Sequence, residues 1–359
     1  SNVIIKSNKI IIEKNKFLVF HNVAQEGKTI NRHLFQKNSN FVKPIEILSN
    51  YLQNNIREKY YFNAVNYWIE KLIYYKKNFY INNYKPIITL IVNTHKGYFG
   101  YLEKALKSIK ISKNLFKLII INDDKDFNTK LYIFNLLKKY NFKNFEIFEY
   151  SKKGISFCRN QGIKNSDTKW ITFIDGDDEL KLVNFNFQKI LKNKFDLVIF
   201  NHVVKSKNEI NKSYDYKFNG DFNKKNKINL IKSYLEKPKG NSIITQCWSK
   251  IYKVKFLKDN KIKFNIKWKI YEDIFFVSEV LLKCKNLFID RRILYQHIFR
   301  TKKNFYLSHI NSDNYIYALK NFSKILPNKI RNKYFILSKD YWIKKIAFIN
   351  SQYSKKFKI

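Results

Sequence analysis

Between residues 87 and 178 the chain alternates short apolar runs with segments of helical spacing. Four runs rich in β-branched and aromatic residues are typical of buried strands, at 87–94, 116–123, 144–150 and 170–178. Segments with apolar residues every three or four positions separate them, at 101–109, 129–140 and 156–164. This alternation predicts a parallel sheet with helices on its faces and ligands at the carboxyl ends of its strands.

The regions on either side follow other patterns. Residues 1–85 begin with strand-like alternation and continue with a helical stretch over about 44–77. Residues 301–359 are basic and helical in spacing. We therefore expect an N-terminal α+β accessory region of unknown role (1–85), an α/β domain (86–300) and a helical C-terminal region (301–359).

The formal net charge of +42 first suggests a nucleic-acid partner. However, Lys, Asn, Ile, Phe and Tyr are all abundant, whereas Gly (8), Pro (4) and Met (0) are scarce, a profile that AT-rich coding would produce. The lysines are scattered and form no single tract. We therefore expect no nucleic acid and favour an anionic membrane surface as the partner of this charge. A basic nucleic-acid-binding protein without enzymatic activity stays open as an alternative.

The cysteines and the apolar runs constrain location. Cys158, Cys247 and Cys284 lie far apart and have no metal-type or disulfide-framework spacing. The N-terminus has no secretion-signal pattern, and no apolar run approaches the roughly 20 residues that span a bilayer. We expect a cytoplasmic chain, either soluble or peripheral on the inner face of the cytoplasmic membrane.

The acidic turn Asp175-Gly176-Asp177-Asp178 directly follows an apolar run. Three carboxylates within four residues repel one another in a dry site, and Mn²⁺ or Mg²⁺ relieves that repulsion. A metal at a strand end can bridge a diphosphate and stabilise it as a leaving group. The alternative is an acidic strand-to-helix turn that caps a helix. The motif alone favours neither reading.

Two other segments contain residues that could bind a nucleotide. Residues 151–162 contain G-x-x-x-x-R-N-x-G, in which Gly154 suits a tight turn, Gly162 suits a helix end, and Arg159 can present its guanidinium to a nucleotide. Asp123 ends the apolar run 116–123, where its carboxylate can accept a hydrogen bond from a pyrimidine N–H. Taken alone, each is better explained by an ordinary structural role, as a solvent-facing arginine or a turn aspartate.

Further charged residues lie in the last third of the α/β domain. Glu272 and Asp273 precede an apolar helical run, and adjacent helical carboxylates point about 100° apart. We expect one to face a sugar as general base and the other to support it, not both to act at one atom. The alternative is an acidic first turn favoured by the helix dipole. His297 and Arg300 can offset diphosphate charge or be structural, and Tyr295 is expected in the core.

The order of these motifs resembles the family 2 glycosyltransferases, which have the A-type glycosyltransferase fold. The matching segments are 88–109, IINDD (120–124), the G-x-x-x-x-R-N-x-G segment, FIDGDD (173–178), CWSKIY (247–252), YEDIFF (271–276) and ILYQHIFR (293–300). Bacterial members that build surface glycans such as lipooligosaccharide or capsule share the later segments. The resemblance spans about residues 86–300 and implies a Rossmann-like, mostly parallel central sheet with flanking helices.

The resemblance also implies a role for each matching residue. The nucleotide-sugar site would comprise Thr94, Asp123, Arg159, Asp175 and Arg300. The Mn²⁺ or Mg²⁺ site would comprise Asp177, Asp175 and His297. Asp273 would be the general base, Glu272 would position the acceptor, and Trp248 would form part of the acceptor floor.

The reaction implied is an inverting single displacement from a UDP-sugar to a glycan or glycolipid hydroxyl. The chain departs from the family pattern at His95, Lys96, Asn122 and Asp124, and these changes affect the expected binding of the nucleotide base more than the expected reaction class.

A sugar nucleotidyltransferase is the enzymatic alternative, but its Gly-rich phosphate loop is poorly matched by residues 92–100. The aromatic, basic tail either rests on an anionic membrane or caps the main domain. The sequence does not indicate an oligomeric state.

Overall fold

The computed structural model describes residues 46, 49–50, 52, 54–80, 86–109, 115–182, 187, 195–206, 210–214, 220–238, 244–268, 270–299 and 313–357. The chain divides into two compact units, Ser1–Phe79 and Tyr80–Ile359. In the first unit the expected helix is present as α3 (Asn54–Tyr80). The strands expected near the N-terminus lie outside the described residues, as does Arg300.

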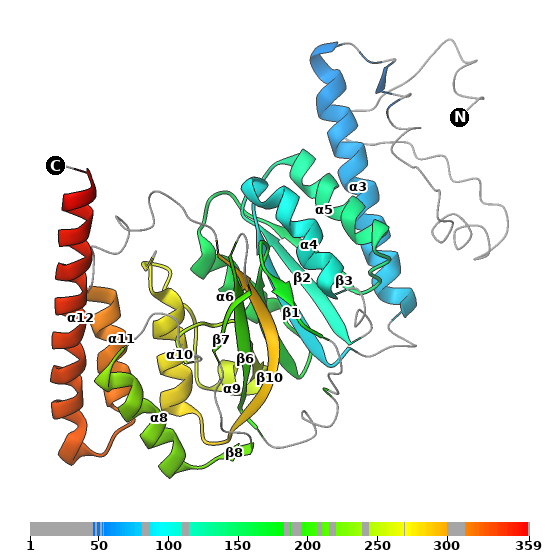
Figure 1. Cartoon of the computed structure of the whole chain (residues 1–359). Helices are drawn as coiled ribbons and strands as arrows, with labels where there is room; N and C mark the ends of the chain where they lie inside the picture. The colour runs from blue at the N-terminus through cyan, green and yellow to red at the C-terminus, as the bar shows by residue number, and fades with distance from the viewer. Residues whose placement is uncertain are drawn as a thin grey trace, which may run out of the picture. The chain divides into compact units, whose positions relative to one another are not determined.

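The second unit is built on one mixed sheet with the strand order β3-β2-β1-β4-β9-β6-β10-β5 (Figure 1). Six strands run in the same direction: β1 (Ile88–Thr94), β2 (Phe116–Asn122), β3 (Phe145–Glu149), β4 (Trp170–Asp175), β6 (Leu197–Lys205) and β10 (Leu287–Ile298). Four shorter strands pair antiparallel: β5 (Glu179–Leu180), β7 (Ile210–Tyr214), β8 (Gly220–Phe222) and β9 (Lys250–Lys253). The expected mostly parallel sheet is confirmed, with β9 inserted antiparallel between β4 and β6.

The first half of the sheet follows from its apolar pattern. Every residue of β1 and β2 is buried, as expected for parallel strands covered on both faces. The helices between the strands are α4 (Phe99–Ile109), α5 (Phe127–Lys139) and α6 (Ile155–Asn165). Helix α4 buries Leu102, Ala105, Leu106 and Ile109, a single helical face.

Gly162 lies inside α6, so the expectation that it ends a helix is wrong. A Cβ at this position would lie 2.5 Å from Cγ2 of Ile91 on β1. The glycine therefore allows α6 to approach the sheet closely, and the helix continues to Asn165.

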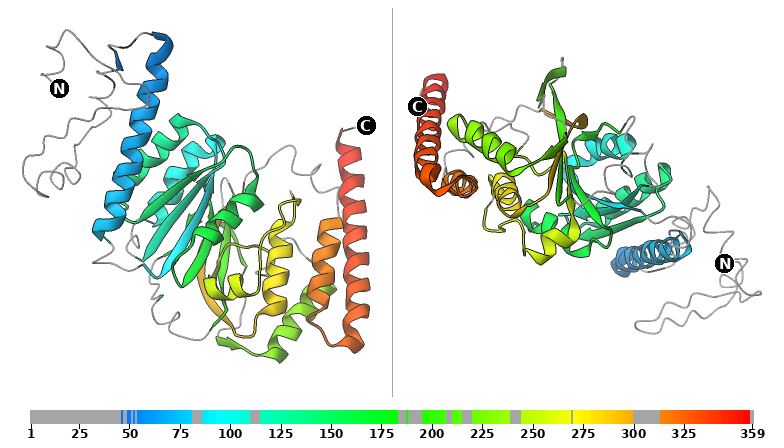
Figure 2. Two further views of the ribbon diagram at one scale, coloured as in Figure 1. Left: turned by 180° about the vertical axis from the view of Figure 1, so that it is seen from behind. Right: turned by 90° about the horizontal axis from the view of Figure 1, so that it is seen from below.

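The C-terminal half adds α8 (Lys224–Glu236), α9 (Val254–Asp259), α10 (Glu272–Lys283), α11 (Asp313–Ser323) and α12 (Asn328–Phe357). Helix α11 packs between α10 and α12, and α12 also contacts α8 (Figures 1 and 2). The rings of Tyr315 and Trp342 stack 3.8 Å apart, and the hydroxyls of Tyr234 and Tyr315 lie 2.7 Å apart. The expected helical C-terminal region is confirmed over 313–357. Across the described residues, no helix is long and apolar enough to cross a membrane.

Candidate functional site

Strands β1, β2 and β4 end side by side, and the acidic turn follows the carboxyl end of β4. Thr94 is paired with Asn122, and Asn93 with Asp175. The Gly176 amide donates to the carbonyl oxygen of Asn93 (2.9 Å), and a Cβ on Gly176 would lie 2.7 Å from that oxygen. The turn therefore lies directly against the end of β1, which only glycine permits at this position.

Two polar side chains at the end of β1 are buried without a partner. Asn93 is 7% exposed and Thr94 3% exposed. Within the described residues neither the Asn93 amide nor the Thr94 hydroxyl has a hydrogen-bond partner. Since an unsatisfied buried polar group costs about 1–3 kcal/mol, both side chains fit a site that receives a polar ligand.

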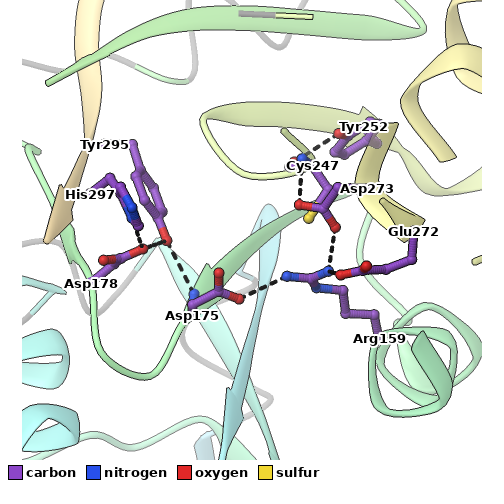
Figure 3. Close-up of polar contacts among 9 residues, drawn as sticks. All are labelled: Arg159, Asp175, Asp178, Cys247, Tyr252, Glu272, Asp273, Tyr295 and His297. Carbon is purple, nitrogen blue, oxygen red and sulfur yellow. Dashed lines mark hydrogen bonds and ion pairs between the residues drawn. The ribbon is translucent and has the colours of Figure 1, made fainter. Parts of the chain in front are cut away.

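Arg159 connects the acidic turn to the first turn of α10 (Figure 3). Its side chain is 2% exposed, and its Nη2 donates to Oδ1 of Asp175 (2.9 Å). Its Nη1 donates both to Oε1 of Glu272 (3.2 Å) and to Oδ1 of Asp273. Both carboxylates thus contact one guanidinium nitrogen, because the longer glutamate side chain reaches it as well. The separate roles expected for Glu272 and Asp273 toward a substrate stay predictions.

The charges in this cluster shift the pKa values of its members. Burial raises the pKa of Asp175, while the Arg159 guanidinium partly opposes the shift. Burial, reinforced by the charge of Asp273, raises the pKa of Glu272 to about 7. Burial lowers the pKa of Arg159, but the neighbouring charges, first that of Asp273, raise it well above its ordinary value. One permanent cation thus faces three carboxyl groups, and a proton is exchangeable there near neutral pH.

Asp273 is held on both sides. It lies in the first turn of α10, after Tyr271 in the left-handed region (φ 63°), and is 9% exposed. Besides its contact with Arg159, its Oδ2 accepts a hydrogen bond from the backbone N–H of Cys247 (3.3 Å). The carboxylate is therefore oriented before any substrate binds.

Asp178 anchors the end of β10 to the acidic turn. Its Oδ2 accepts a hydrogen bond from the Tyr295 hydroxyl (2.7 Å) and lies 3.1 Å from Nδ1 of His297, and its Oδ1 accepts from the Ile298 amide (2.8 Å). The amide of Asp175 donates to the same Tyr295 hydroxyl (3.2 Å). Tyr295 is fully buried, which confirms the core expectation, but its polar role was missed.

The alternative in which the acidic turn caps a helix is wrong, because the turn leads directly into β5.

Among the described residues, no three His, Cys, Asp or Glu side chains converge to hold a metal. Asp177 is half-buried after Gly176. Burial lowers the pKa of His297, but the hydrogen bond to Asp178 and nearby carboxylate charges raise it overall.

Asp123 shapes the turn into α6. Its two carboxylate oxygens accept hydrogen bonds from the amides of Lys153 and Gly154, each 2.7 Å long. Gly154 has φ 86°, in the region that favours glycine. The Asp123 side chain thus lies just after the carboxyl end of β2 and holds this turn through its hydrogen bonds. Pyrimidine recognition by Asp123 stays a prediction.

Trp248 is 6% exposed and lies within an aromatic cluster. Its ring stacks on Tyr295 (4.4 Å between centroids, 8° between planes) and on His297 (5.7 Å, 16°). The ring of His202 meets it edge-on at 4.7 Å. A part in acceptor binding stays a prediction for Trp248.

Lys250 and Tyr252 hold the loop that carries Trp248, a function that sequence reasoning missed. The Lys250 ammonium donates to the carbonyls of Gln246 (2.5 Å) and Trp248 (3.4 Å). The Tyr252 hydroxyl donates to the carbonyl of Cys247 (2.7 Å). The signal was present in the K-x-Y part of W-x-K-x-Y, because Lys250 and Tyr252 are two apart on β9 and therefore point to the same side.

Replacing Lys250 by methionine should change how stability depends on pH. Burial lowers the pKa of Lys250 to about 7, whereas an unfolded lysine titrates at about 10.4. Between these values the unfolded chain binds a proton that the folded chain does not, so this group makes the free energy of unfolding rise with pH. Urea denaturation at pH 7 and pH 9.5 should show that rise in the wild type and a smaller one in the variant.

The matched control is Lys255→Met, since the Lys255 side chain is 79% exposed. It should keep the pH dependence of the wild type. An identical pH dependence in Lys250→Met would show that Lys250 is not buried in its neutral form.

Comparisons with known proteins agree with this architecture. Residues 89–259 match the family model described as "Glycosyl transferase family 2". The chain is 27% identical over 244 residues to the minor teichoic acid biosynthesis protein GgaB of Bacillus subtilis, covering 65% of this chain and 25% of that protein. It is 25% identical over 242 residues to the glycosyltransferase GlyA of Streptococcus pneumoniae, covering 65% and 33%. The chain thus spans about a quarter to a third of the length of these relatives.

A solved structure shares the fold. The crystal structure of S. aureus TarS 1–349 in complex with UDP-GlcNAc superposes with a TM-score of 0.50 at 16% identity, covering 75% of this chain and 92% of that one. With the observed mixed sheet and its flanking helices, this likeness confirms the A-type fold expected from the sequence.

Proposed function

Because residues 89–259 form a family 2 glycosyltransferase domain, we propose that this chain moves a sugar from a nucleotide-sugar to a hydroxyl of a bacterial surface glycan or its lipid-linked precursor. The observation that carries the proposal is the Arg159 bridge. It joins Asp175, at the end of β4, to Glu272 and Asp273, which lie 97 and 98 residues later in the chain (272−175 and 273−175), at the carboxyl ends of the strands where ligands bind α/β sheets.

The proposed donor is a UDP-sugar. The TarS neighbour is described in complex with UDP-GlcNAc, which supports this choice. Among the residues that the structure describes, the buried side chains of Asn93 and Thr94 have no hydrogen-bond partner, and they lie beside the acidic turn, where a nucleotide or diphosphate can satisfy them. Arg300 and Asp123 stay proposed members of the nucleotide-sugar site.

The proposed chemistry is a single displacement with inversion. Asp273 accepts the proton of the acceptor hydroxyl as that oxygen attacks the anomeric carbon from the face opposite the diphosphate. The new C–O bond forms as the bond to the diphosphate breaks, and the nucleoside diphosphate leaves with the electron pair. Arg159 and the Cys247 amide hold the Asp273 carboxylate, so its orientation precedes binding.

A divalent cation, Mn²⁺ or Mg²⁺, is part of the proposal. Hard carboxylate oxygens of Asp175 and Asp177 suit such an ion, and Nδ1 of His297 lies against Asp178, an arrangement typical of metal-binding imidazoles that use their other nitrogen. Mg²⁺ commonly uses one or two carboxylates together with substrate phosphates. When bound, the ion would neutralise charge on the leaving diphosphate.

The acceptor is proposed from the relatives. GgaB is named for minor teichoic acid biosynthesis, which supports a surface-polymer acceptor. The division into an accessory region (1–85), a catalytic domain (86–300) and a C-terminal region (301–359) stays part of the proposal, as does location at the inner face of the cytoplasmic membrane.

The decisive test is a screen of nucleotide-sugars with Mn²⁺ and a mixture of surface-glycan precursors. Release of UDP in the presence of one sugar supports transfer. Release of pyrophosphate instead would indicate a sugar nucleotidyltransferase and overturn the proposal.

Replacing Asp177 by alanine should remove the metal dependence of donor binding. We expect UDP affinity measured by calorimetry in Mn²⁺ to fall at least tenfold, which corresponds to about 1.4 kcal/mol, while affinity in EDTA stays unchanged. The matched control is Asp259→Ala, whose side chain is 55% exposed and pairs with Lys255 on α9. Equal affinity of the Asp177 variant and the wild type in Mn²⁺ would refute this metal assignment.

A further inference from the structure

Helix α12 has two apolar faces, and within the described part of the chain only one of them is covered. Its inner residues Phe335, Trp342 and Ile346 pack on the core cluster, and Ser338 is fully buried. Large apolar side chains also point to solvent from the same helix: Ile336 (50% exposed), Leu337 (43%), Ile343 (46%) and Phe348 (64%). Single exposed apolar residues are ordinary, but four on one helix face are a typical mark of an interaction surface.

Helix α12 is strongly basic. The helix carries eight basic residues and a single acidic one, Asp340. Lys333 and Lys344 are exposed on the same outer face as the apolar side chains, and Lys339 is exposed at its border. The exposed Asp340 also lies on this face, which therefore carries three cations and one anion. Helical spacing places Lys344 close to Leu337 and Phe348, so cationic and apolar groups alternate across this face.

The face is held rigidly on the outside of the second unit. Figures 1 and 2 show α11 and α8 on the inner side of α12, with nothing drawn against its outer side. The Tyr315–Trp342 ring stack fixes the helix to α11. At 1.5 Å per residue, its 30 residues extend about 45 Å, enough for a broad contact along a flat surface.

We propose that the outer face of α12, defined by Lys333, Ile336, Leu337, Lys339, Ile343, Lys344 and Phe348, docks on an anionic lipid bilayer. The aliphatic and aromatic side chains would enter the headgroup region, and the lysine ammonium groups would pair with lipid phosphates. The helix lies in the plane of the surface and does not span it, in keeping with its composition.

Charge and side-chain chemistry favour a lipid surface over other occupants. A second copy of this chain would bring two strongly basic helices together, and the whole chain carries a net charge of +42. A nucleic acid would use the lysines and could stack a base on Phe348, but it gains little from the aliphatic side chains of Ile336, Leu337 and Ile343, which make up most of the apolar part of this face. An anionic bilayer satisfies both kinds of side chain. This inference concerns where the chain acts and is independent of the sugar transfer proposed above.

The test is co-sedimentation of the full chain with vesicles of phosphatidylcholine alone or with 30% phosphatidylglycerol. We expect at least tenfold stronger binding to the anionic vesicles, weakened by 0.5 M NaCl. The combined variant Ile336→Ser, Ile343→Ser, Phe348→Ser should bind these vesicles at least tenfold more weakly. The combined variant Lys333→Gln, Lys339→Gln, Lys344→Gln should lose the preference for phosphatidylglycerol.

Ile266→Ser is the matched control, because Ile266 is 63% exposed but lies outside α12. It should bind vesicles as the wild type does, and circular dichroism should show that all variants fold. Unchanged vesicle binding by the serine variant would overturn the proposal. So would a concentration-dependent dimer, detected by sedimentation velocity without lipid, that the serine variant abolishes, since the face would then bind a second copy.

Discussion

Replacing Arg159 by methionine is expected to cost about 3 kcal/mol or more of folding stability, because removing one partner of a buried ionic cluster leaves uncompensated charge. The guanidinium is 2% exposed and is the cation that contacts Asp175, Glu272 and Asp273. Without it, these carboxylates must either take up protons or remain charged in the interior. Urea denaturation followed by circular dichroism measures the loss.

The cost should grow with pH. Burial already raises the pKa of Glu272 to about 7 in the wild type. A carboxyl with a raised folded-state pKa contributes stability that is present below its unfolded pKa and lost as pH rises through the folded value. Removing the cation extends this behaviour to the whole cluster, so the difference between wild type and variant should be larger at pH 8 than at pH 5.

Lys139→Met is the matched control for a lost basic residue. Its ion pair with Glu103 is 2.6 Å long but exposed, 62% and 37% for the two side chains. Exposed pairs of this kind contribute about 0–1 kcal/mol. If both variants lost equal stability, the Arg159 cluster would not be the buried ionic bridge that the structure describes.

Replacing Asp273 by asparagine is expected to lower the turnover number by about 10²–10⁴-fold, the usual contribution of a general base. The amide oxygen of asparagine can replace Oδ1 and accept the hydrogen bond from Arg159. Its NH₂ group then takes the place of Oδ2, so only the longer bond from the Cys247 amide (3.3 Å) is lost, and the fold and the proposed donor site should persist. UDP binding in Mn²⁺ should therefore match the wild type. Product release from a nucleotide-sugar, with calorimetry for UDP, measures both.

Glu272→Gln is the comparison within the same turn. Glutamine keeps the contact with Nη1 of Arg159 and removes only the ionisable group. As the residue proposed to position the acceptor, Glu272 should affect the acceptor KM more than the turnover number. Near-normal turnover in Asp273→Asn, with a collapse in Glu272→Gln, would assign the base to Glu272 instead.

The first half of the sheet could be predicted because its information is local. Each of the runs that became β1, β2 and β4 is mostly apolar, and each is followed within a few residues by a turn. The acidic turn was located for the same reason, since it directly follows the strand that presents it.

The partners of Arg159 could not be predicted, because they depend on contacts across 113 and 114 residues. The contact between Tyr295 and Asp178 spans 117 residues and requires the register of β10 against β5. Strand β9 has only four residues and no distinct periodicity, so neither its place between β4 and β6 nor its direction was visible. Side chains from distant segments are brought together by tertiary packing, which motif order indicates but does not specify.

The place of β9 also has a kinetic consequence. The sheet cannot become continuous until Lys250–Lys253 insert between β4 and β6, and β4 ends 75 residues before β9 begins. Closing so long a loop is paid for in chain entropy before any native pairing is gained, so this step is intrinsically slow. Cys247 lies just before β9, and Asp273 follows it on α10. We therefore infer that these groups of the proposed site come together only after β9 has docked.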